Sequence, residues 1–413
     1  MKIGIVTTWF ERGAAHVSRQ FEKVIGEKHQ MFIYARGGEK YARHDPEWDH
    51  PNVYWSRRYR LVDSYIDRKE FVRWIAENSI DAVIFNEQRY FEPLLWCKEL
   101  NVKSIAYIDY YTEEMLPLFD AYDALICNTR RHYSAFEEFD HVFYIPWGTD
   151  VDLYKPSKLE GSLVEQNRVT FFNSAGVSPQ RKGTDTFLKA LNKCKVHPNI
   201  KAIIHSQVNL KKCLPHLAET IDQLVESGKL EIVEKTIPAP GLYHQADVYV
   251  YPSILDGIGL TVPEAISSGL ACVVSDNPPM NEFVQPEFGS LIPITRLYAR
   301  SDGYYWPQCK CDVDVLSEMM VHLADVPQNV VEMKKNARQY AVEKLSFPKN
   351  ASGIFEILEK IHIRNISDEL KEQIKSFDRK EKKGIMMRIN QSKILLFIYE
   401  LMKNIQKLFG NNK

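Results

Sequence analysis

The chain has 413 residues, of which 45% are hydrophobic and 26% charged, which is the composition of an ordinary folded protein. A chain of this length is too long for a single hydrophobic core. Its 53 basic and 54 acidic residues give a formal charge of −1, which argues against a nucleic-acid binder that works through bulk positive charge. The seven scattered cysteines have no disulfide-framework spacing, and no apolar run reaches the ~18–20 residues of a membrane-spanning helix. We therefore expect two domains in a reducing, cytoplasmic compartment.

Short runs rich in Val, Ile, Tyr and Phe alternate with helix-length segments along the chain. In the first half they predict strands at 2–7, 31–35, 81–86, 103–108, 123–127 and 141–145. In the second half they predict strands at 168–172, 200–205, 230–234, 247–251, 271–275 and 289–293. Near-continuous apolar strands suit parallel sheets covered by helices on both faces. The pattern predicts an α/β protein with two doubly wound, Rossmann-like domains, whose ligands bind beyond the carboxyl ends of the strands.

Turn residues between Ile145 and Pro156 close the first half, and a polar stretch follows to about Arg168. Beyond residue 345 the pattern becomes helical, with Pro348 as a break, and the composition changes again at 379. We expect an N-terminal domain at 1–150, a linker at 151–167 and a C-terminal domain at 168–345. C-terminal helices should follow at 346–378 and a tail at 379–413.

The segment from Asp247 to Ala265 predicts a strand, a glycine-bearing loop and a helix. Gly257 and Gly259 let the backbone approach a ligand closely, and the unpaired N–H groups at the helix start suit an anion. Asp256 lies on the loop and Glu264 in the first helical turn, so both can face one cavity. The alternative, of about equal weight from these residues alone, makes Asp256 a turn residue and Glu264 a complement to the helix dipole.

A second polar cluster, from Gly176 to Gly183, follows the first strand of the second half. Here Arg181 and Lys182 precede a glycine that opens a helix, and their charges suit a diphosphate. A solvated basic turn is the alternative. Asp150-Val151-Asp152 and Asp312-Val313-Asp314 have the spacing of a metal-binding Asp-X-Asp motif, but we expect turns there and no metal site.

The segment from Asp256 to Ala265 resembles the donor-binding signature of retaining glycosyltransferases with the GT-B fold, especially glycosyltransferase family 4. The similarity continues through 268–276 and 281–284, and the segment 148–156 is similar to that family's interdomain linker. These matches span roughly residues 1–360 in order. The resemblance implies a GT-B fold, in which two Rossmann-like domains face each other across a cleft and a C-terminal crossover helix follows.

The resemblance also implies roles for residues on the donor side. Asp256 would bind hydroxyls of the transferred sugar and Glu264 the nucleotide ribose, while the backbone of Gly259, Leu260 and Thr261 would approach the sugar and the diphosphate. The family usually has glutamate where this chain has the aspartate, so the side chain is shorter by one methylene.

Charged and small residues elsewhere complete the implied donor site. Lys182 would hold the diphosphate, with Arg181 replacing an arginine that the family has at the position of Val177. Gly13, in the loop after the first strand, would contact the same diphosphate. His16, close by, is more simply a surface or packing histidine.

Two further positions follow the strands of the first half. Asp109 stands where many family members have a histidine; it either accepts a proton or orients the sugar, or it caps the next helix. Together with Asp256 and Glu264 it is a candidate catalytic residue. Asn86 and Glu87, after the third strand, are candidate acceptor-binding residues.

The tail at 379–413 contains nine basic and two acidic residues, which gives it a charge of +7. Apolar residues recur in it at helical spacing, namely Ile394, Ile398, Leu401, Ile405 and Leu408. Such a basic amphipathic helix suits an anionic membrane surface, and packing against the body or a second subunit is the alternative. A second basic-aromatic patch, Tyr54–Arg60, either docks an anionic acceptor or is an exposed loop.

The resemblance implies a retaining, metal-independent glycosyltransferase that moves a hexose-type sugar from a UDP- or GDP-linked donor to a hydroxyl of a glycan or lipid-linked acceptor. We expect a role in bacterial surface polysaccharide assembly, no cofactor, no nucleic-acid partner, and a peripheral location on the inner face of the cell membrane. The alternatives are a soluble transferase similar to sucrose or glycogen synthase, and a catalytically silent GT-B scaffold. Val177, Asp256 and the absent histidine favour the scaffold, whereas Lys182 and Glu264 oppose it.

Overall fold

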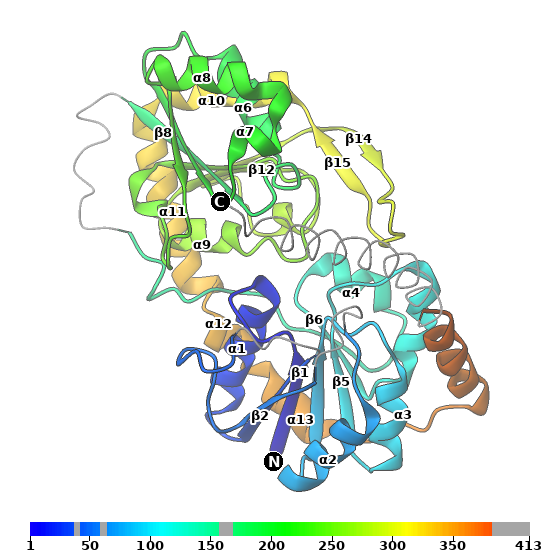
Figure 1. Ribbon diagram of the computed structural model, residues 1–413. Helices are drawn as coiled ribbons and strands as arrows, with labels where there is room; N and C mark the ends of the chain where they lie inside the picture. The colour runs from blue at the N-terminus through cyan, green and yellow to red at the C-terminus, as the bar shows by residue number, and fades with distance from the viewer. Residues whose placement is uncertain (37–41, 58–63, 157–167, 382–413) are drawn as a thin grey trace, which may run out of the picture. The chain divides into compact units, whose positions relative to one another are not determined.

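The computed structural model describes residues 1–36, 42–57, 64–156 and 168–381 (Figure 1). The chain divides into two compact units, and each is built around a parallel sheet. The first unit comprises 1–108, 114–125 and the chain from 358 onward; the second comprises 109–113 and 126–357. This architecture confirms the prediction of an α/β protein with two Rossmann-like domains.

The first sheet has seven strands in the order β3-β2-β1-β4-β5-β6-β7. Ile5 of β1 lies opposite Ile33 of β2 and Ile84 of β4, and all three side chains are buried. The strands are β1 (Lys2–Thr7), β2 (Gln30–Ala35), β3 (Val53–Trp55), β4 (Ala82–Asn86), β5 (Lys103–Tyr107), β6 (Ala124–Cys127) and β7 (Val142–Tyr144). The helices are α1 (Gly13–Ile25), α2 (Arg68–Asn78), α3 (Glu92–Glu99), α4 (Arg130–Phe136) and a 3₁₀ helix at Glu113–Ala121.

The second sheet has six strands in the order β10-β9-β8-β11-β12-β13. These are β8 (Val169–Gly176), β9 (Ile200–Ser206), β10 (Leu230–Glu234), β11 (Val248–Tyr251), β12 (Ala271–Ser275) and β13 (Gly289–Ile292). The helices are α6 (Thr184–Lys193), α7 (Leu210–Cys213), α8 (Ala218–Glu226), α9 (Thr261–Ser267), α10 (Val313–Asp325), α11 (Pro327–Lys344), α12 (Phe347–Ala351) and α13 (Gly353–Lys360). Short 3₁₀ helices lie at Pro215–Leu217, Tyr243–Gln245 and Met280–Glu282.

All twelve predicted strands form, and the described residues contain three further strands that were not predicted. The strand β3 has only three residues, which is too short to stand out as an apolar run. The antiparallel pair β14 (Ile294–Tyr298) and β15 (Gln308–Cys311) was also missed, because the middle of β14 is exposed and carries no buried apolar pattern. Pro348 lies in the first turn of α12, so it begins a helix and does not break one as predicted.

The core of the second unit lies between its sheet and the helices α6, α8 and α10. Phe187 and Leu191 of α6 are fully buried there, as are Ile221 and Leu224 of α8 and Leu316 of α10. In each of these helices, apolar residues recur three or four positions apart and form one apolar stripe that faces the sheet. This packing fixes the sheet and leaves the loops at its carboxyl edge to carry polar side chains.

The last described segment is helical from 368 to 381 and packs on the first unit. Its Asp378 is fully buried and accepts hydrogen bonds from the backbone N–H groups of Phe91, at 3.0 Å, and Glu92, at 2.7 Å. A carboxylate at this position satisfies free donors at the start of α3. The predicted amphipathic tail, apart from residues 379–381, lies outside the described residues, as does part of the predicted linker. In the described part of the chain no helix is long and apolar enough to cross a membrane.

Candidate functional site

The loops that follow β8 and β11 leave the second sheet at its topological switch point. The strands β8 and β11 are neighbours, yet the strands that follow each of them in the chain, β9 and β12, lie on opposite sides of the pair. In open parallel sheets a crevice for ligands forms where the strand order reverses in this way. The loops of both segments singled out in the sequence, 176–183 and 247–265, therefore begin at this one point.

The structure brings Lys182 and Arg181 together on the carboxylate of Asp256. The ammonium Nζ lies 2.6 Å from Oδ2, and a guanidinium nitrogen lies 3.0 Å from Oδ1. The hydroxyl of Tyr251 donates a short hydrogen bond to the same carboxylate and contacts Nζ. Burial alone would raise the pKa of the Asp256 carboxyl, but the two cations outweigh it and hold this pKa well below its ordinary value. The aspartate is therefore ionised at neutral pH and the cluster carries a net positive charge.

The cluster is not sealed from solvent. Side-chain exposure is 15% for Lys182, 14% for Asp256 and 37% for Arg181. Burial lowers the pKa of the lysine ammonium, with the aspartate opposing that shift. Because both cations are partly accessible and share one carboxylate, each can also bind an incoming anion in place of part of its contact with Asp256. A diphosphate site requires this chemistry.

Backbone contacts hold the two loops against each other. The carbonyl oxygen of Arg181 accepts hydrogen bonds from Ile254 N and Ser253 Oγ, each at 3.0 Å. Its guanidinium in turn donates to the carbonyl oxygen of Leu255 at 3.0 Å. These contacts fix the position of Asp256 relative to the cations, so the arrangement is built into the fold and does not depend on one flexible ion pair.

Gly183 shows how tightly the loops meet. It precedes α6 with a φ of 67°, and a methyl group placed on it would lie 1.8 Å from the carbonyl oxygen of Pro252. Gly176, at the other end of the loop, also has a positive φ, of 54°, but open space around it.

We predict that Gly183→Ala lowers the free energy of unfolding by more than about 3 kcal/mol, because backbone strain adds to a steric clash. Gly176→Ala is the matched control and should cost about 1–2 kcal/mol, from the unfavourable φ alone. Urea denaturation of both variants measures the difference. Equal losses would mean that the two loops do not pack as closely as described.

Glu264 lies in the first turn of α9, as predicted, and is partly exposed. Its Oε2 accepts a hydrogen bond of 2.7 Å from the hydroxyl of Tyr243, whose pKa is raised by burial and by this carboxylate. Gly259, before the helix, has a φ of 79°, which glycine adopts without strain. Leu260 and Thr261 follow at the start of the helix, so the predicted backbone approach to a ligand is geometrically available.

Asp109 belongs to the second unit and lies beside the loop that carries Asp256. A methyl group placed on Gly257 would lie 2.9 Å from Asp109 Oδ1, so the carboxylate lies close to the backbone of this loop. The carbonyl oxygen of Asp109 is 3.3 Å from the hydroxyl of Tyr304, which can donate to it. The structure therefore brings four of the predicted residues, from segments far apart in the chain, to one place: Asp109, Arg181, Lys182 and Asp256.

Sequence analysis missed Arg131, which is 96% buried beside the same loop. Its guanidinium donates to the carbonyl oxygens of Asp256 and Pro278, each at 2.5 Å, and lies 3.3 Å from that of Gly257. Glu282 accepts the backbone N–H of this arginine at 2.9 Å and of its neighbour Arg130 at 2.6 Å. The one available signal was position, since Arg131 follows β6 at the carboxyl end of a strand.

The predicted residues of the first unit occupy different environments. Gly13 is exposed and begins α1. Asn86 is 98% buried, and its amide donates to Ala14 O and Ser18 Oγ, each at 2.8 Å, so it ties β4 to α1. Glu87 is partly exposed, and its carboxylate lies 3.3 Å from the guanidinium of Arg12. Of the two acceptor-side candidates, only the glutamate offers a reachable side chain.

The other polar motifs have local structural roles. Asp150 accepts hydrogen bonds from the backbone of Asp152 and Leu153, and Asp312 caps α10 by accepting from Asp314 and Val315. Within the described ranges, no group of three or more His, Cys, Asp or Glu side chains could hold a metal ion. Of the basic-aromatic patch, Tyr54 stacks on Tyr34, while residues 58–60 fall outside the described residues.

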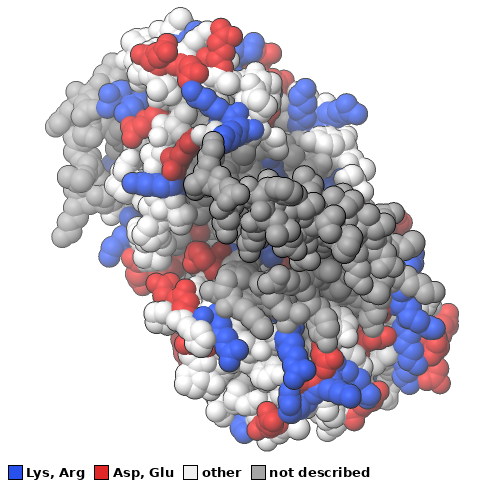
Figure 2. Space-filling view, in the orientation of Figure 1, with Lys and Arg blue, Asp and Glu red and all other residues white. Residues whose placement is uncertain are grey.

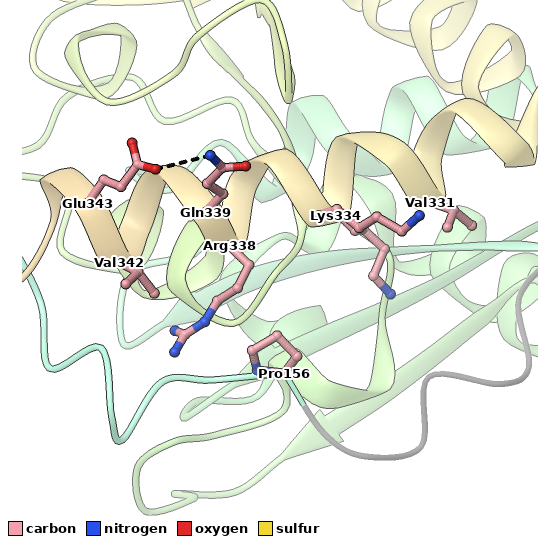
Figure 3. Close-up of a pocket in the computed structure, with 8 residues that line it drawn as sticks. Pro156, Val331, Lys334, Arg338, Gln339, Val342 and Glu343 are labelled. Atoms are coloured by element: carbon pink, nitrogen blue, oxygen red, sulfur yellow. Dashed lines mark hydrogen bonds between the residues drawn. The ribbon is translucent and has the colours of Figure 1, made fainter.

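A pocket of about 720 Å³ lies along α11, away from this site (Figure 3). Its Lys334 pairs with Asp247 at 3.0 Å, and its Arg338 donates to the carbonyl oxygens of Val151 and Ser267, each at 2.9 Å. Asp247 immediately precedes β11, so the pocket adjoins the amino end of that strand. Ligands of such sheets bind at the opposite, carboxyl end. The pocket is therefore not the candidate site.

Comparison with known proteins points to one family. Residues 158–300 match the family of group 1 glycosyl transferases. The MMP alpha-(1->4)-mannosyltransferase of Mycolicibacterium hassiacum is 25% identical over 226 residues, which cover 54% of this chain and 49% of that protein. The chain thus matches about half the length of that relative.

Solved structures share the fold over most of this chain. Anabaena Alr3699/HepE in complex with UDP has a TM-score of 0.69 at 16% identity, covering 87% of this chain and 100% of that one. Sucrose-phosphate synthase from Thermosynechococcus elongatus has a TM-score of 0.61 at 16% identity, covering 87% of this chain and 98% of that one. These likenesses show the GT-B fold, and the family match supports a glycosyltransferase.

Proposed function

We propose that this chain, whose residues 158–300 match the group 1 glycosyltransferases, moves a hexose-type sugar from a nucleotide sugar to a hydroxyl of a glycan or lipid-linked acceptor. One observation carries the proposal: Lys182 and Arg181 converge on Asp256 at the switch point of the second sheet, beside the start of α9. This is a cluster of net positive charge with a fixed carboxylate, which suits a diphosphate attached to a polyhydroxylated sugar.

Each residue then has a distinct task. Lys182 and Arg181 bind the diphosphate and stabilise the charge that develops as it leaves, which is the task a divalent metal performs in other enzymes. Asp256, held by its neighbours at a fixed position, accepts hydrogen bonds from sugar hydroxyls. Glu264, partly exposed at the start of α9, binds the ribose. From the family resemblance we also propose Gly13, at the start of α1, as a backbone contact of the diphosphate.

We further propose that transfer proceeds with retention and without a metal. The acceptor hydroxyl attacks the anomeric carbon on the face that the diphosphate leaves, and the departing phosphate oxygen takes the acceptor's proton. Asp109, beside Gly257, orients the sugar or the acceptor at this point. Glu87 contributes on the acceptor side. Asn86 supports α1 from within the first unit, and its buried amide makes it a positioning residue in this scheme.

A thermal-shift screen with UDP, GDP, ADP and their glucose and mannose conjugates tests the proposal, followed by measurement of nucleotide release. A donor present at 100 times its Kd stabilises the protein by about 2.7 kcal/mol, which gives a clear rise in Tm. We expect one nucleotide series to stabilise the chain and its sugar conjugate to release the nucleotide when acceptor is added. Binding without release for every donor and acceptor would support the silent scaffold instead, and no binding at all would overturn the proposal.

We also propose that the protein works at the inner face of the cell membrane, held there by the basic amphipathic tail. On the described part of the face shown in Figure 2, basic and acidic side chains are interspersed. The charge of +7 makes the tail suited to anionic lipid.

Flotation of the full chain on vesicles containing phosphatidylglycerol, compared with a chain that ends at residue 378, measures this directly. We expect only the full chain to float, and to lose binding in 0.5 M salt or on phosphatidylcholine vesicles, because surface electrostatics are screened. Equal flotation of the two chains on anionic vesicles would contradict a role for the tail.

A further inference from the structure

The tip of the β14–β15 hairpin packs against the segment that carries Asp109. Tyr304 forms a bridge with Thr112, and the backbone N–H of Tyr305 donates to the carbonyl oxygen of Tyr111 at 3.0 Å. The indole N–H of Trp306 donates to the hydroxyl of Tyr111 at 2.5 Å. All of these residues belong to the second unit, from whose sheet the hairpin extends (Figure 1). The tip is therefore held in place by backbone and side-chain hydrogen bonds.

These contacts support a stack of aromatic rings with one exposed member. The rings of Tyr110 and Tyr304 stack at 5.3 Å, and that of Tyr305 lies 5.5 Å from the buried ring of Tyr111. Trp306 meets Tyr305 edge-on at 5.2 Å. Tyr305 is nevertheless 40% exposed, whereas Tyr304 and Tyr111 are buried. An exposed ring fixed by buried rings loses little conformational freedom when it binds a ligand.

The aromatic tip adjoins the candidate site. The hydroxyl of Tyr304 is within hydrogen-bond distance of Asp109 O, at 3.3 Å, and lies 3.5 Å from the guanidinium of Arg131. That guanidinium in turn binds the carbonyl oxygen of Asp256. A continuous set of contacts thus joins the tip to the loop that we assign to the transferred sugar.

Polar groups lie around the rings. Arg300 and Asp302 form an ion pair of 3.0 Å, with side chains 37% and 38% exposed, and the hydroxyl of Tyr110 lies 3.3 Å from the same aspartate. A pyranose ring has an apolar C–H face and a rim of hydroxyls. It therefore matches an exposed aromatic ring with a carboxylate and a guanidinium at its edge, whereas an acyl chain could form no hydrogen bond with either charged group.

We propose that the tip of the β14–β15 hairpin, residues 300–306, is the binding subsite for a sugar ring of the acceptor glycan. Tyr305 stacks on the apolar face of the ring, and Asp302 and Arg300 bind its hydroxyls. The inference rests on the proposed function, which it deepens by assigning the acceptor a pyranose at this position. It places a determinant of acceptor specificity in the second unit, next to the donor loop.

Saturation-transfer NMR with the full chain, UDP and a panel of methyl hexopyranosides tests the subsite. The panel contains both anomers of the glucoside, mannoside and galactoside. We expect at least one hexoside to bind wild type, Tyr305→Ala to weaken it about tenfold, and Tyr305→Trp to retain it, because stacking needs an aromatic face. Asp302→Ala should weaken it by a similar factor. Leu297→Ala, which removes a 57% exposed side chain from the same hairpin, is the matched control and should leave binding unchanged.

The stabilisation of each variant by UDP separates this inference from the proposed function. Tyr305→Ala should retain the wild-type rise in Tm with UDP, because the tyrosine does not contact the diphosphate site. UDP binding without any hexoside binding would overturn the subsite and leave the proposed function standing. Loss of hexoside binding in Leu297→Ala as well as in Tyr305→Ala would also overturn it, since the hairpin would then act only through its fold. If no nucleotide of the thermal-shift screen binds wild type, the proposed function itself fails.

Discussion

Replacing Lys182 with alanine should lower the rate of sugar transfer by at least about 100-fold while the protein remains folded. In the structure its ammonium neutralises part of the Asp256 carboxylate, at 2.6 Å. We assign it the additional task of stabilising the leaving diphosphate, where one lost charge-assisted contact has an effect of this size. The Arg181 contact to the same carboxylate remains in the variant, so Asp256 does not lose all compensation.

Initial-rate kinetics with the donor identified in the nucleotide screen give the measurement. Lys201→Ala is the matched control, because this lysine lies on β9 of the same unit, pairs with Glu231 at 3.2 Å on the surface, and belongs to neither loop of the site. It should retain wild-type rates. Wild-type transfer by the Lys182 variant would contradict its assignment to the diphosphate.

Replacing Glu264 with alanine should raise the donor KM and reduce kcat/KM by about 100-fold, because we assign its carboxylate to the ribose hydroxyls. The same variant removes the acceptor for the hydroxyl of Tyr243, which is buried and bonded to it at 2.7 Å. A loss of stability alone could therefore imitate a loss of binding.

Tyr243→Phe separates these two effects. It deletes the same 2.7 Å hydrogen bond but keeps the carboxylate. We expect Tyr243→Phe to lose some stability and to keep the donor KM within about threefold of wild type, whereas Glu264→Ala changes KM strongly. Isothermal titration with the nucleotide provides an independent measure. Equal changes in KM for the two variants would mean that the carboxylate acts on the fold and not on the donor.

The local pattern of apolar residues was sufficient to predict the parallel strands of the two sheets and the loops that carry Arg181, Lys182 and Asp256. Buried parallel strands require continuous apolar runs, so β1 and β12 were visible in the sequence with their observed bounds. The hairpin β14–β15 was missed because Arg296 and Leu297, in the middle of β14, are exposed. Only buried strands require the run of apolar residues from which strands were predicted. The feature that carries our inference on the acceptor is therefore one that periodicity could not reveal.

The sequence by itself determined the parallel α/β architecture, the position of the loops after β8 and β11, and the spacing that puts Glu264 in the first turn of α9. These follow from burial and chain geometry within short segments. Only the tertiary structure decided that Arg131 supports the Asp256 loop, that Asp109 lies beside Gly257 and that the amide of Asn86 is committed to α1. Those contacts join residues that are between 68 and 148 positions apart, and local periodicity carries no information about which distant side chains meet.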